Sequence, residues 1–169
     1  MKRRDFILMS FCSLPGFLLH NQGKTAMAKT SENNKSSEFP LQLSEQEWKS
    51  KLTAEEFRVL RKNGTEPPNS SPLNDEKRNG TFVCAGCGHP LFSSRHKYES
   101  GTGWPSFYQP INDQAVGTRT DYKLIWPRTE VHCANCGGHQ GHVFEDGPEP
   151  TGLRYCINGV ALDFKPEDS

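Results

Sequence analysis

The sequence CAGCG at residues 84–88 recurs, with a single change, as CANCG at residues 133–137. Each copy has the pattern C-x-x-C-G, in which two intervening residues let both sulfurs of one turn reach the same ion and the glycine permits a tight backbone. Two such turns supply four thiolates, the ligand set that suits tetrahedral Zn²⁺. Such an ion would join two segments that lie far apart in the sequence. The predicted ligands of one structural zinc ion per chain are Cys84, Cys87, Cys133 and Cys136.

Two other uses of these cysteines are considered. An exported chain could form two disulfides from them, and a C-x-x-C pair can also act in redox chemistry. The duplication of the whole C-x-x-C-G pattern favours zinc over both alternatives.

Outward from these motifs, the chain from Gly80 onward favours strands, because short aromatic and β-branched runs alternate with Gly, Pro and Asp. Two short helices are expected before them, at capping boxes that begin with Ser44 and Thr53, and the second should end at Asn63. The predicted fold is a mostly antiparallel β domain with helices only at its N-terminal end. The predicted strands are TFVC (81–84), YKLIW (122–126), EVHC (130–133), HVF (142–144) and LRYCINGVALDF (153–164).

Residues 1–28 have the layout of an export signal. A charged start precedes a 13-residue apolar run from Ile7 to Leu19 and a small-x-small cleavage site that ends at Ala28. The run is shorter than the ~20 apolar residues that a transmembrane helix needs, so no stable membrane span is expected. The twin arginine near the start resembles a Tat signal, which predicts a periplasmic protein, although a Sec signal or an uncleaved anchor would give a similar pattern.

The remaining chain divides into a polar, disordered linker at residues 29–40 and a single domain at residues 41–169. Removal of the signal takes away 4 of the 20 basic residues and 1 of the 20 acidic residues, which leaves 16 and 19 and a net charge of −3. These charges are interspersed without a basic stripe, so nucleic-acid binding through phosphate contacts is disfavoured. We expect a monomer.

Cys156, in the sequence LRYCINGV (153–160), has no close cysteine neighbour. In a strand, alternate residues share a face, so Arg154 and Asn158 should point the same way as Cys156. A guanidinium and an amide beside a thiol lower its pKa and favour the reactive thiolate. A buried structural cysteine is an equally good explanation, because free cysteine is among the most buried residue types.

Three further residues are candidates for a site with Cys156. His139 and His142 of HQGHVF could act as acid–base groups, but a regular strand places them on opposite faces unless a bulge at Gly141 reverses this. Either histidine could equally be satisfied at the surface or in the core. Trp104, on the constrained loop GTGWPSF, could form a pocket wall or simply fill the core.

Taken together, these stretches resemble the methionine-R-sulfoxide reductases, the B-type peptide-methionine sulfoxide reductases. The match runs from Leu43 to Phe164 and includes GTEPPNSSPLNDEKRNGTFVCAGCGHPLFSS, ESGTGWPSF, HCANCGGHQGHVFEDGPEPTGLRYCIN and ALDF. The resemblance implies a mainly β fold of two antiparallel sheets, with the four-cysteine zinc site away from the catalytic centre. It also implies that the chain repairs oxidised protein substrates by reducing methionine R-sulfoxide to methionine.

The resemblance assigns roles to single residues. Cys156 matches the nucleophile, and His139 and His142 match the acid and substrate-positioning pair. Asn158 resembles the residue that helps to hold a water and orient the site. Trp104 would receive the methyl group of the sulfoxide.

Two positions of the match, Asp146 and Arg154, would shape the electrostatics of the site. The chain departs from many members at Thr102, where those members carry a resolving cysteine. With Cys12 of the signal and the predicted zinc ligands set aside, Cys156 has no partner left, so the chain resembles a single-cysteine variant. A sulfenic acid formed on Cys156 would then be reduced directly by a small thiol or a thioredoxin-like protein.

Two other functions are weighed against this one. A cysteine hydrolase could use Cys156 with His142 and Asn158, and it would cleave ester or amide substrates. A non-catalytic zinc-ribbon binding module would not need Cys156 at all. The ordered match from Trp104 to Asn158 favours the reductase over both.

Overall fold

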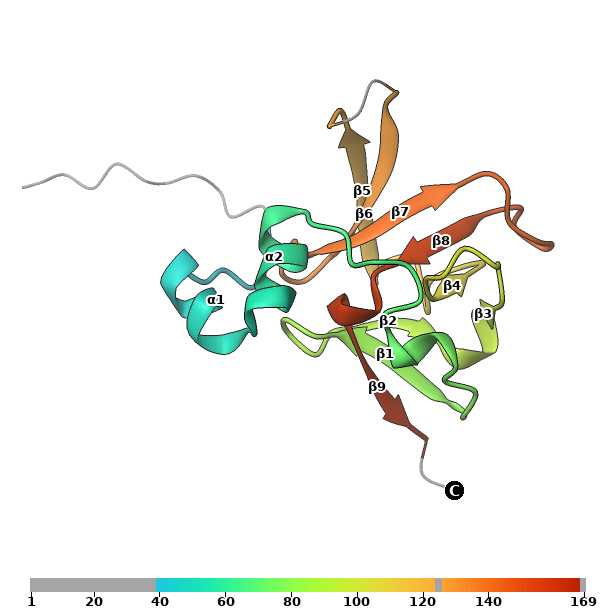
Figure 1. Ribbon diagram of the computed structural model, residues 1–169, viewed down its shortest axis with the longest axis horizontal. Coiled ribbons are helices and arrows are strands. Elements are labelled where there is room, and N and C mark those ends of the chain that lie inside the picture. The colour runs from blue at the N-terminus through green and yellow to red at the C-terminus, as the bar shows by residue number, and fades with distance from the viewer. Residues whose placement is uncertain (1–38, 124–125, 168–169) are drawn as a thin grey trace, which may run out of the picture. The chain divides into compact units, whose positions relative to one another are not determined.

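The computed structural model of the chain describes residues 39–123 and 126–167 (Figure 1). The predicted export signal and residues 29–38 of the predicted linker lie outside this range. Phe39, inside the predicted linker, packs edge-on against the ring of His132 with a centroid distance of 5.4 Å. Among the described residues, no helix is long and apolar enough to cross a membrane.

Two short helices, α1 (Glu45–Lys51) and α2 (Ala54–Lys62), come first in the described chain, as predicted. Each begins with a complete capping box, built on Ser44 and on Thr53 respectively. The reciprocal bonds of a capping box satisfy first-turn amides that have no partner within the helix. Helix α2 ends at Asn63, whose left-handed backbone (φ 51°) turns the chain away from the helix axis.

The strands form two antiparallel sheets, which confirms the predicted fold class. One sheet has the order β2-β1-β9 and the other has the order β3-β4-β8-β7-β6-β5. Short 3₁₀ helices lie at η1 (Pro72–Asn74), η2 (Ser94–His96) and η3 (Gly159–Ala161). The strands are β1 (Gly80–Cys84), β2 (Pro90–Ser93), β3 (Lys97–Tyr98), β4 (Ser106–Phe107), β5 (Val116–Asp121), β6 (Arg128–Cys133), β7 (His139–Phe144), β8 (Arg154–Ile157) and β9 (Leu162–Pro166).

The structure corrects two of the strand predictions. Tyr122 and Trp126, from the predicted strand at 122–126, lie instead between β5 and β6 and are 77% and 79% exposed. The strand that precedes them, β5, has the polar sequence VGTRTD and was not predicted. The predicted strand at 153–164 divides into β8, η3 and β9, because the chain leaves the larger sheet after Ile157 and enters the smaller one at Leu162.

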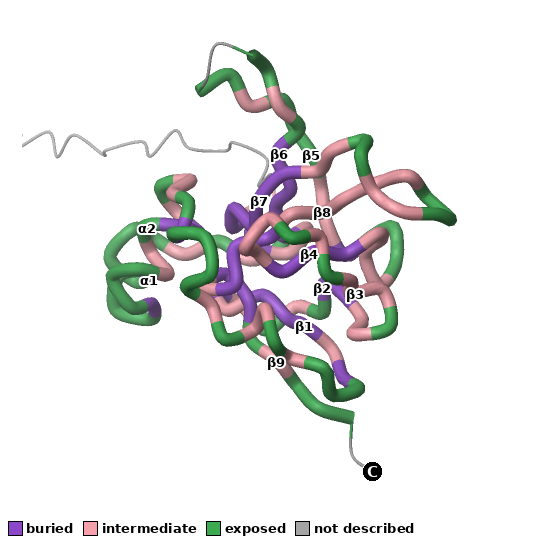
Figure 2. Tube along the Cα trace, turned by 45° about the vertical axis from the view of Figure 1, so that its right-hand side comes forward, coloured by how far each residue is buried: buried purple, intermediate pink, exposed green. Residues whose placement is uncertain are grey.

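The hydrophobic core lies between the two sheets. Phe82 of β1 and Phe92 of β2 each pack on Phe107 of β4, with ring centroids 5.0 and 4.4 Å apart, and all three side chains are fully buried. Figure 2 shows that the buried residues follow β1, β6 and β7, whereas many exposed residues lie on the two helices. The aromatic contacts therefore connect the smaller sheet to the larger one through apolar surface removed from water.

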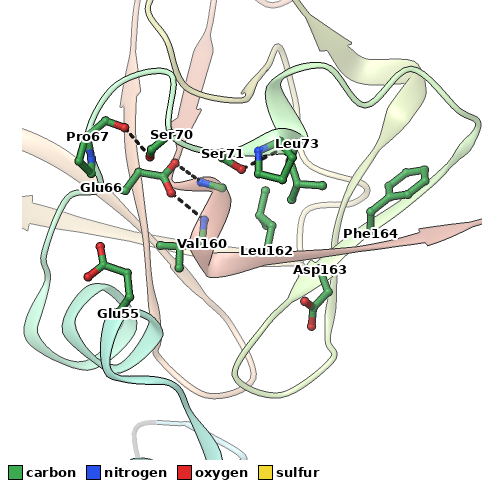
Figure 3. Close-up of a pocket in the computed structure, with 12 residues that line it drawn as sticks. Glu55, Glu66, Pro67, Ser70, Ser71, Leu73, Val160, Leu162, Asp163 and Phe164 are labelled. Carbon is green, nitrogen blue, oxygen red and sulfur yellow. Dashed lines mark hydrogen bonds between the residues drawn. The ribbon is translucent and has the colours of Figure 1, made fainter.

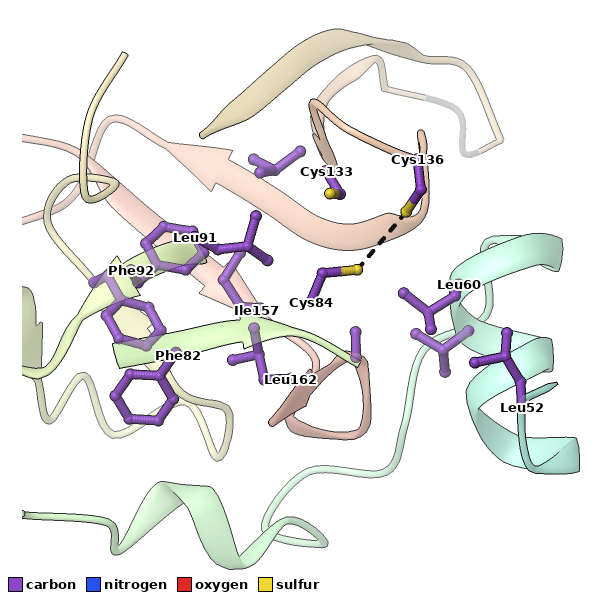
Figure 4. Close-up of a cluster of buried hydrophobic side chains, with 14 of the residues drawn as sticks. Leu52, Leu60, Phe82, Cys84, Leu91, Phe92, Cys133, Cys136, Ile157 and Leu162 are labelled. Atoms are coloured by element: carbon purple, nitrogen blue, oxygen red, sulfur yellow. Dashed lines mark hydrogen bonds between the residues drawn. The ribbon is translucent and has the colours of Figure 1, made fainter. Parts of the chain in front are cut away.

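The two helices cover the cysteine-containing turns (Figure 4). Trp48 of α1 and Leu60 of α2 are each 2% exposed and belong to the same buried cluster as Cys84 and Cys136. The guanidinium of Arg61 lies over the Trp48 ring at 4.8 Å, and its Nη1 donates to the Cys136 carbonyl at 3.0 Å. The sequence predicted the position of these helices at the N-terminal end of the domain. The structure shows that they also pack against the cysteine cluster.

Candidate active site and metal centre

The two C-x-x-C-G motifs form matching turns at the ends of two strands. Strand β1 ends at Cys84 and β6 ends at Cys133. The N–H of Gly88 donates to the Cys84 carbonyl at 2.7 Å, and the N–H of Gly137 donates to the Cys133 carbonyl at 2.9 Å. Both glycines have positive φ values, 73° and 68°, which residues with side chains disfavour. The backbone of each turn therefore requires the glycine of its motif.

The sulfurs of these four cysteines form one compact cluster, in which all lie within 4.8 Å of one another. The Cys84 and Cys136 sulfurs are 3.8 Å apart, and the Cys87 and Cys133 sulfurs are 3.6 Å apart. A disulfide bond would need about 2.05 Å, and all four cysteines are free. The cluster can hold a metal ion, and the two-disulfide alternative does not match this arrangement.

The cysteine cluster joins the two sheets, because β1 belongs to the smaller sheet and β6 to the larger one. The fully buried side chain of Gln140 extends this connection. Its Nε2 donates to the Cys84 sulfur at 3.4 Å, and its backbone carbonyl accepts from the backbone N–H of Asn158 at 2.8 Å and from the Asn158 side-chain amide at 2.9 Å. Gln140 therefore links the cluster to the residue that follows Cys156 by two positions.

A separate cavity of about 140 Å³ contains Cys156. None of the clustered cysteines lines it, so an ion held by them would not contact a molecule bound in the cavity. Four of the predicted site residues line the cavity together with residues that the sequence did not identify. The lining residues are Thr65, Trp104, Arg128, Gly141, His142, Phe144, Cys156 and Asn158.

Cys156 lies in β8 between two neighbouring strands. In the strand register it is opposite Ser106 of β4 on one side and His142 of β7 on the other. Opposed residues in antiparallel strands have Cβ atoms about 5 Å apart, so His142 is a direct neighbour of the thiol. The hydroxyl of Thr102 is 3.9 Å from the Cys156 sulfur. The position where many relatives were expected to carry a resolving cysteine therefore faces Cys156.

Burial raises the pKa of the Cys156 thiol, while the Thr102 hydroxyl and the Arg154 guanidinium act in the opposite direction. The sequence predicted a lowered pKa from the guanidinium. The structure differs because Arg154 is already paired with Asp146, through bonds of 2.9 and 2.8 Å, and because the thiol is withdrawn from solvent. Without a bound substrate, the neutral thiol is therefore the favoured form.

A bulge in β7 brings the two candidate histidines to one side of the sheet. Consecutive residues of β6 pair with Gly141 and with His139, so Gln140 is the extra residue on β7. The ring centroids of His139 and His142 are 5.4 Å apart. The sequence left open whether a bulge at Gly141 exists, and the structure has one at the adjacent residue.

His142 is the histidine that lines the cavity. Its Nε2 is 2.8 Å from Oδ2 of Asp121, and the same oxygen accepts from Nη2 of Arg128 at 2.8 Å. Burial acts to raise the pKa of Asp121, but hydrogen bonds from the backbone N–H of Lys123, from His142 and from Arg128 hold it well below its usual range. The ionised carboxylate accepts the Nε2–H of His142, which leaves Nδ1 with the lone pair.

The same surroundings keep the His142 ring neutral. Burial lowers the pKa of His142, although the hydrogen bond to Asp121 acts to raise it. Because the pKa lies below the ordinary value, the imidazole is uncharged near neutral pH. A neutral imidazole with a free Nδ1 beside a thiol can accept a proton.

His139 is 2% exposed and is not among the residues that line the cavity. Its Nδ1 is 2.8 Å from Oε1 of Glu130. Burial acts to raise the pKa of Glu130, but hydrogen bonds from His139 and Arg119 lower it to about 2. The Nε2 of His139 is buried and has no hydrogen-bond partner among the described residues. Because an unpaired buried polar atom costs free energy, this nitrogen is a candidate contact for a water or a bound polar group.

Of three further predicted site residues, Trp104 lines the cavity, whereas Arg154 and Asp146 lie outside its lining. Trp104 lines it, and its Nε1 donates to the carbonyl of Glu66 at 3.2 Å. Arg154 and Asp146 form an ion pair outside the lining. The Arg154 guanidinium lies 4.5 Å from the ring centroid of Phe144, which does line the cavity. The ion pair therefore acts on the cavity through Phe144.

Four residues of the site were not predicted from the sequence: Thr65, Arg128 and Phe144 in the lining, and Asp121 behind His142. Phe144 could have been found, because it lies two residues after His142 and shares its strand face. Asp121 and Arg128 pair directly across the β5–β6 hairpin, a relation concealed by the misplaced strand prediction. No local signal marks Thr65.

Comparison with known proteins assigns the domain to a family. The SelR domain matches residues 52–166 of this chain. That range contains all four clustered cysteines and every residue that lines the cavity.

Curated relatives named peptide methionine sulfoxide reductase MsrB are similar to most of the chain. The protein of Leptospira interrogans serogroup Icterohaemorrhagiae serovar Lai is 52% identical over 129 residues, which cover 76% of this chain and 98% of the relative. The protein of Methanosarcina barkeri is 55% identical over 125 residues, which cover 74% and 88%. The protein of Pseudomonas putida is 54% identical over 123 residues, which cover 73% and 92%.

Replacement of Asp121 by Asn should lower the pKa of His142 further. The variant removes the carboxylate that opposes the effect of burial and leaves Arg128 beside His142 without its ion-pair partner, so protonation of the imidazole becomes less favourable. The pKa is measured from the ring-proton shift of His142 in an NMR pH titration. Asp113→Asn, which alters an exposed carboxylate, is the matched control and should not change the titration. An unchanged or raised pKa in Asp121→Asn would contradict the role given to this carboxylate.

Proposed function

This chain belongs to the SelR-domain family, and we propose that it reduces methionine R-sulfoxide in oxidised proteins with Cys156 as the nucleophile. About half of its residues are identical to those of the MsrB relatives over about three quarters of its length, and it is a peptide methionine sulfoxide reductase. One observation carries the assignment of Cys156: its thiol shares a cavity and a strand register with a neutral, carboxylate-bound histidine.

His142 is proposed to transfer the proton that the reaction needs. Nε2 is bonded to Asp121, which leaves the lone pair on Nδ1, and His142 is opposite Cys156 in the strand register. The sulfoxide oxygen is a poor leaving group until it is protonated, so an acid close to it accelerates the reaction. His142 accepts the proton of the thiol and donates it to that oxygen. His139 does not line the cavity, so its unpaired Nε2 is proposed to act through a water beside that oxygen.

In the proposed step the Cys156 sulfur attacks the sulfur of the substrate. The attack forms a sulfur–sulfur bond. The protonated oxygen then passes to the Cys156 sulfur while the sulfur–oxygen bond of the substrate and the sulfur–sulfur bond break, and methionine leaves as the sulfide. Cys156 loses two electrons and becomes a sulfenic acid, while the substrate sulfur gains two. Two thiols then reduce the sulfenic acid, releasing water and a disulfide and restoring Cys156.

Trp104 and Phe144 are proposed to select the substrate. Both line a cavity of about 140 Å³, which suits one side chain rather than the ~300–1,000 Å³ of a site for a larger ligand. The sulfur of methionine sulfoxide is chiral, so a fixed apolar wall for its methyl group admits one epimer at the thiol. The indole of Trp104, held through Nε1, is that wall.

We also propose that the cysteine cluster binds one structural Zn²⁺. Four sulfurs placed tetrahedrally at ~2.3 Å from one ion would lie about 3.8 Å apart. The two sulfur pairs at 3.8 and 3.6 Å fit this requirement. Cys84, Cys87, Cys133 and Cys136 would hold the ion as thiolates, and the bound ion would supply folding free energy rather than chemistry in the cavity.

The cellular setting is proposed from the sequence alone. Residues 1–28 direct export, through a Tat-like signal, to the periplasm. The mature chain acts as a monomer on oxidised proteins. Its reductant is a small thiol or a thioredoxin-like protein, because Thr102 cannot supply a second thiol at the position that faces Cys156.

Replacement of Cys84 by Ser should remove the metal and lower the free energy of unfolding by several kcal/mol, because a structural zinc site contributes directly to folding. Metal content and urea unfolding of the purified mature protein test this. Cys156→Ser is the control that removes a thiol outside the cluster and should keep one zinc per chain. A wild-type protein with no metal and with two disulfides by mass spectrometry would rule out the zinc site.

Replacement of Cys156 by Ser should abolish reduction of methionine R-sulfoxide, because a serine hydroxyl, unlike a thiol, cannot be oxidised to a sulfenic acid. Dithiothreitol serves as the reductant, and methionine is quantified. Circular dichroism and metal content should match those of the wild type, because the clustered cysteines are unchanged. Turnover retained in the variant would exclude Cys156 as the nucleophile.

After one equivalent of substrate without reductant, the wild-type protein should carry a sulfenic acid on Cys156 that dimedone traps. Thr102→Cys should instead form an internal disulfide with Cys156 and react faster with thioredoxin, because the side chain at 102 reaches to 3.9 Å from the sulfur. Ser100→Cys adds a thiol nearby without that contact and should not gain this reactivity. Mass spectrometry distinguishes the products. A wild-type disulfide between Cys156 and a cysteine of the cluster would refute the single-cysteine mechanism.

A further inference from the structure

The buried carboxylate of Glu66 contacts the chain just beyond the cavity residue Asn158. Glu66 is 4% exposed, and its two oxygens accept the backbone N–H groups of Gly159 at 2.5 Å and Val160 at 2.9 Å (Figure 3). Burial of a carboxylate is costly unless its oxygens are hydrogen-bonded. Burial raises the pKa of Glu66, and the two N–H groups oppose that shift.

These two N–H groups belong to the first turn of η3, for which Asn158 is the N-cap residue. An asparagine in this position usually accepts a first-turn N–H with its own side chain. Asn158 makes no such bond. Glu66, from a segment more than ninety residues earlier, satisfies the turn instead.

The side-chain amide of Asn158 is thereby free for other contacts. Its Oδ1 accepts the backbone N–H of Glu66 at 3.0 Å, and its Nδ2 donates to the carbonyl of Gln140 at 2.9 Å. With both ends held, the amide has one orientation. One Nδ2 hydrogen remains for a molecule in the cavity, because an amide nitrogen has two.

Glu66 also contacts Trp104, an aromatic residue in the lining of the cavity. Its carbonyl accepts Nε1 of Trp104 at 3.2 Å. One residue therefore contacts both the polar amide and the indole that line the cavity, while Glu66 itself is not among the lining residues. A displacement of Glu66 would move Asn158 and Trp104 together.

We propose that Glu66 is a positioning residue for the reductase reaction: its carboxylate replaces the side-chain cap of η3, and its backbone fixes Asn158 and Trp104 around the substrate sulfur. This inference rests on the proposed function, in which Trp104 contacts the methyl group. Errors of about 1 Å in the position of a reacting group can lower a rate by about a hundredfold. The residue should therefore affect rate and epimer selection as well as stability.

The test compares wild type, Glu66→Ala, Glu66→Gln and Glu55→Gln as mature, zinc-loaded proteins. Glu55 borders the same groove of about 480 Å³ as Glu66. Its carboxylate instead pairs with Arg58 at the surface, so Glu55→Gln is the matched control. Methionine released in a single turnover without reductant gives the fraction of active sites. All rates are divided by that fraction, which removes the contribution of misfolded protein.

For Glu66→Ala we expect kcat/KM for the R epimer to fall at least about tenfold per active site. The preference for R over S should fall by a similar factor, because Asn158 and Trp104 would no longer be held in place around the substrate. Glu66→Gln keeps one acceptor oxygen and should lie between Glu66→Ala and the wild type. Glu55→Gln should match the wild type. Wild-type protein that fails to reduce methionine R-sulfoxide would refute the proposed function itself.

A purely structural Glu66 would give a different result. The active fraction and the melting temperature would fall, but the rate per active site and the epimer preference would stay within about twofold of wild type; that outcome would overturn the proposal. If neither Glu66 variant folds, amide hydrogen exchange of the wild type decides whether Glu66 caps η3. Protection of the Gly159 and Val160 amides is expected, and exchange at the rate of an open loop would refute the cap.

Discussion

The smaller sheet is attached to the larger one at the four cysteines, and this attachment also sets where the cavity lies. Strand β1 of the smaller sheet and β6 of the larger sheet both end in a cysteine of the cluster, and the two N-terminal helices pack over it. From the Cys84 sulfur, buried hydrogen bonds continue through Gln140 to Asn158, then to Glu66 and to Trp104. The cysteine cluster and the cavity are therefore separate in space but share one polar network. One member is not fully satisfied among the described residues, because Oε1 of Gln140 is buried without a hydrogen-bond partner.

The cavity combines a reactive atom with surroundings that keep it unreactive at rest. Burial favours the thiol form of Cys156, and the Asp121 carboxylate fixes His142 as a neutral imidazole with a free Nδ1. The ion pair of Arg154 and Asp146 stabilises the rim but does not by itself produce a thiolate. Reaction would then require a substrate that the Cys156 sulfur can attack and that takes up the proton of the thiol through His142. This arrangement suits a sulfoxide, whose oxygen must be protonated as the sulfur is attacked.

Features that depend on local sequence were predicted, and features that depend on pairing were not. The capping boxes at Ser44 and Thr53 and the C-x-x-C-G turns follow from neighbouring residues, and the structure has all of them.

The polar strand β5 lacks a hydrophobic alternation, so the sequence predicts a strand at the apolar residues after it instead. The bulge at Gln140 depends on the register with β6, which periodicity within one strand cannot reveal. Glu66 belongs to none of the predicted helices and strands, and only the tertiary fold shows its carboxylate beside η3. Of the site residues that the family resemblance implied, Cys156, His142, Trp104 and Asn158 line one cavity, whereas His139, Arg154 and Asp146 do not. The resemblance did not give their protonation states.

In the proposed reaction, one thiol in a chiral cavity takes the oxygen from one epimer of methionine sulfoxide. The most direct measurement is the amount of methionine released when the fully reduced mature chain is mixed, without any reductant, with excess R or excess S epimer. We expect about one methionine per active chain from the R epimer and almost none from the S epimer, because each Cys156 can become a sulfenic acid only once. Equal release from both epimers, or release well above one methionine per chain, would contradict the proposed reaction.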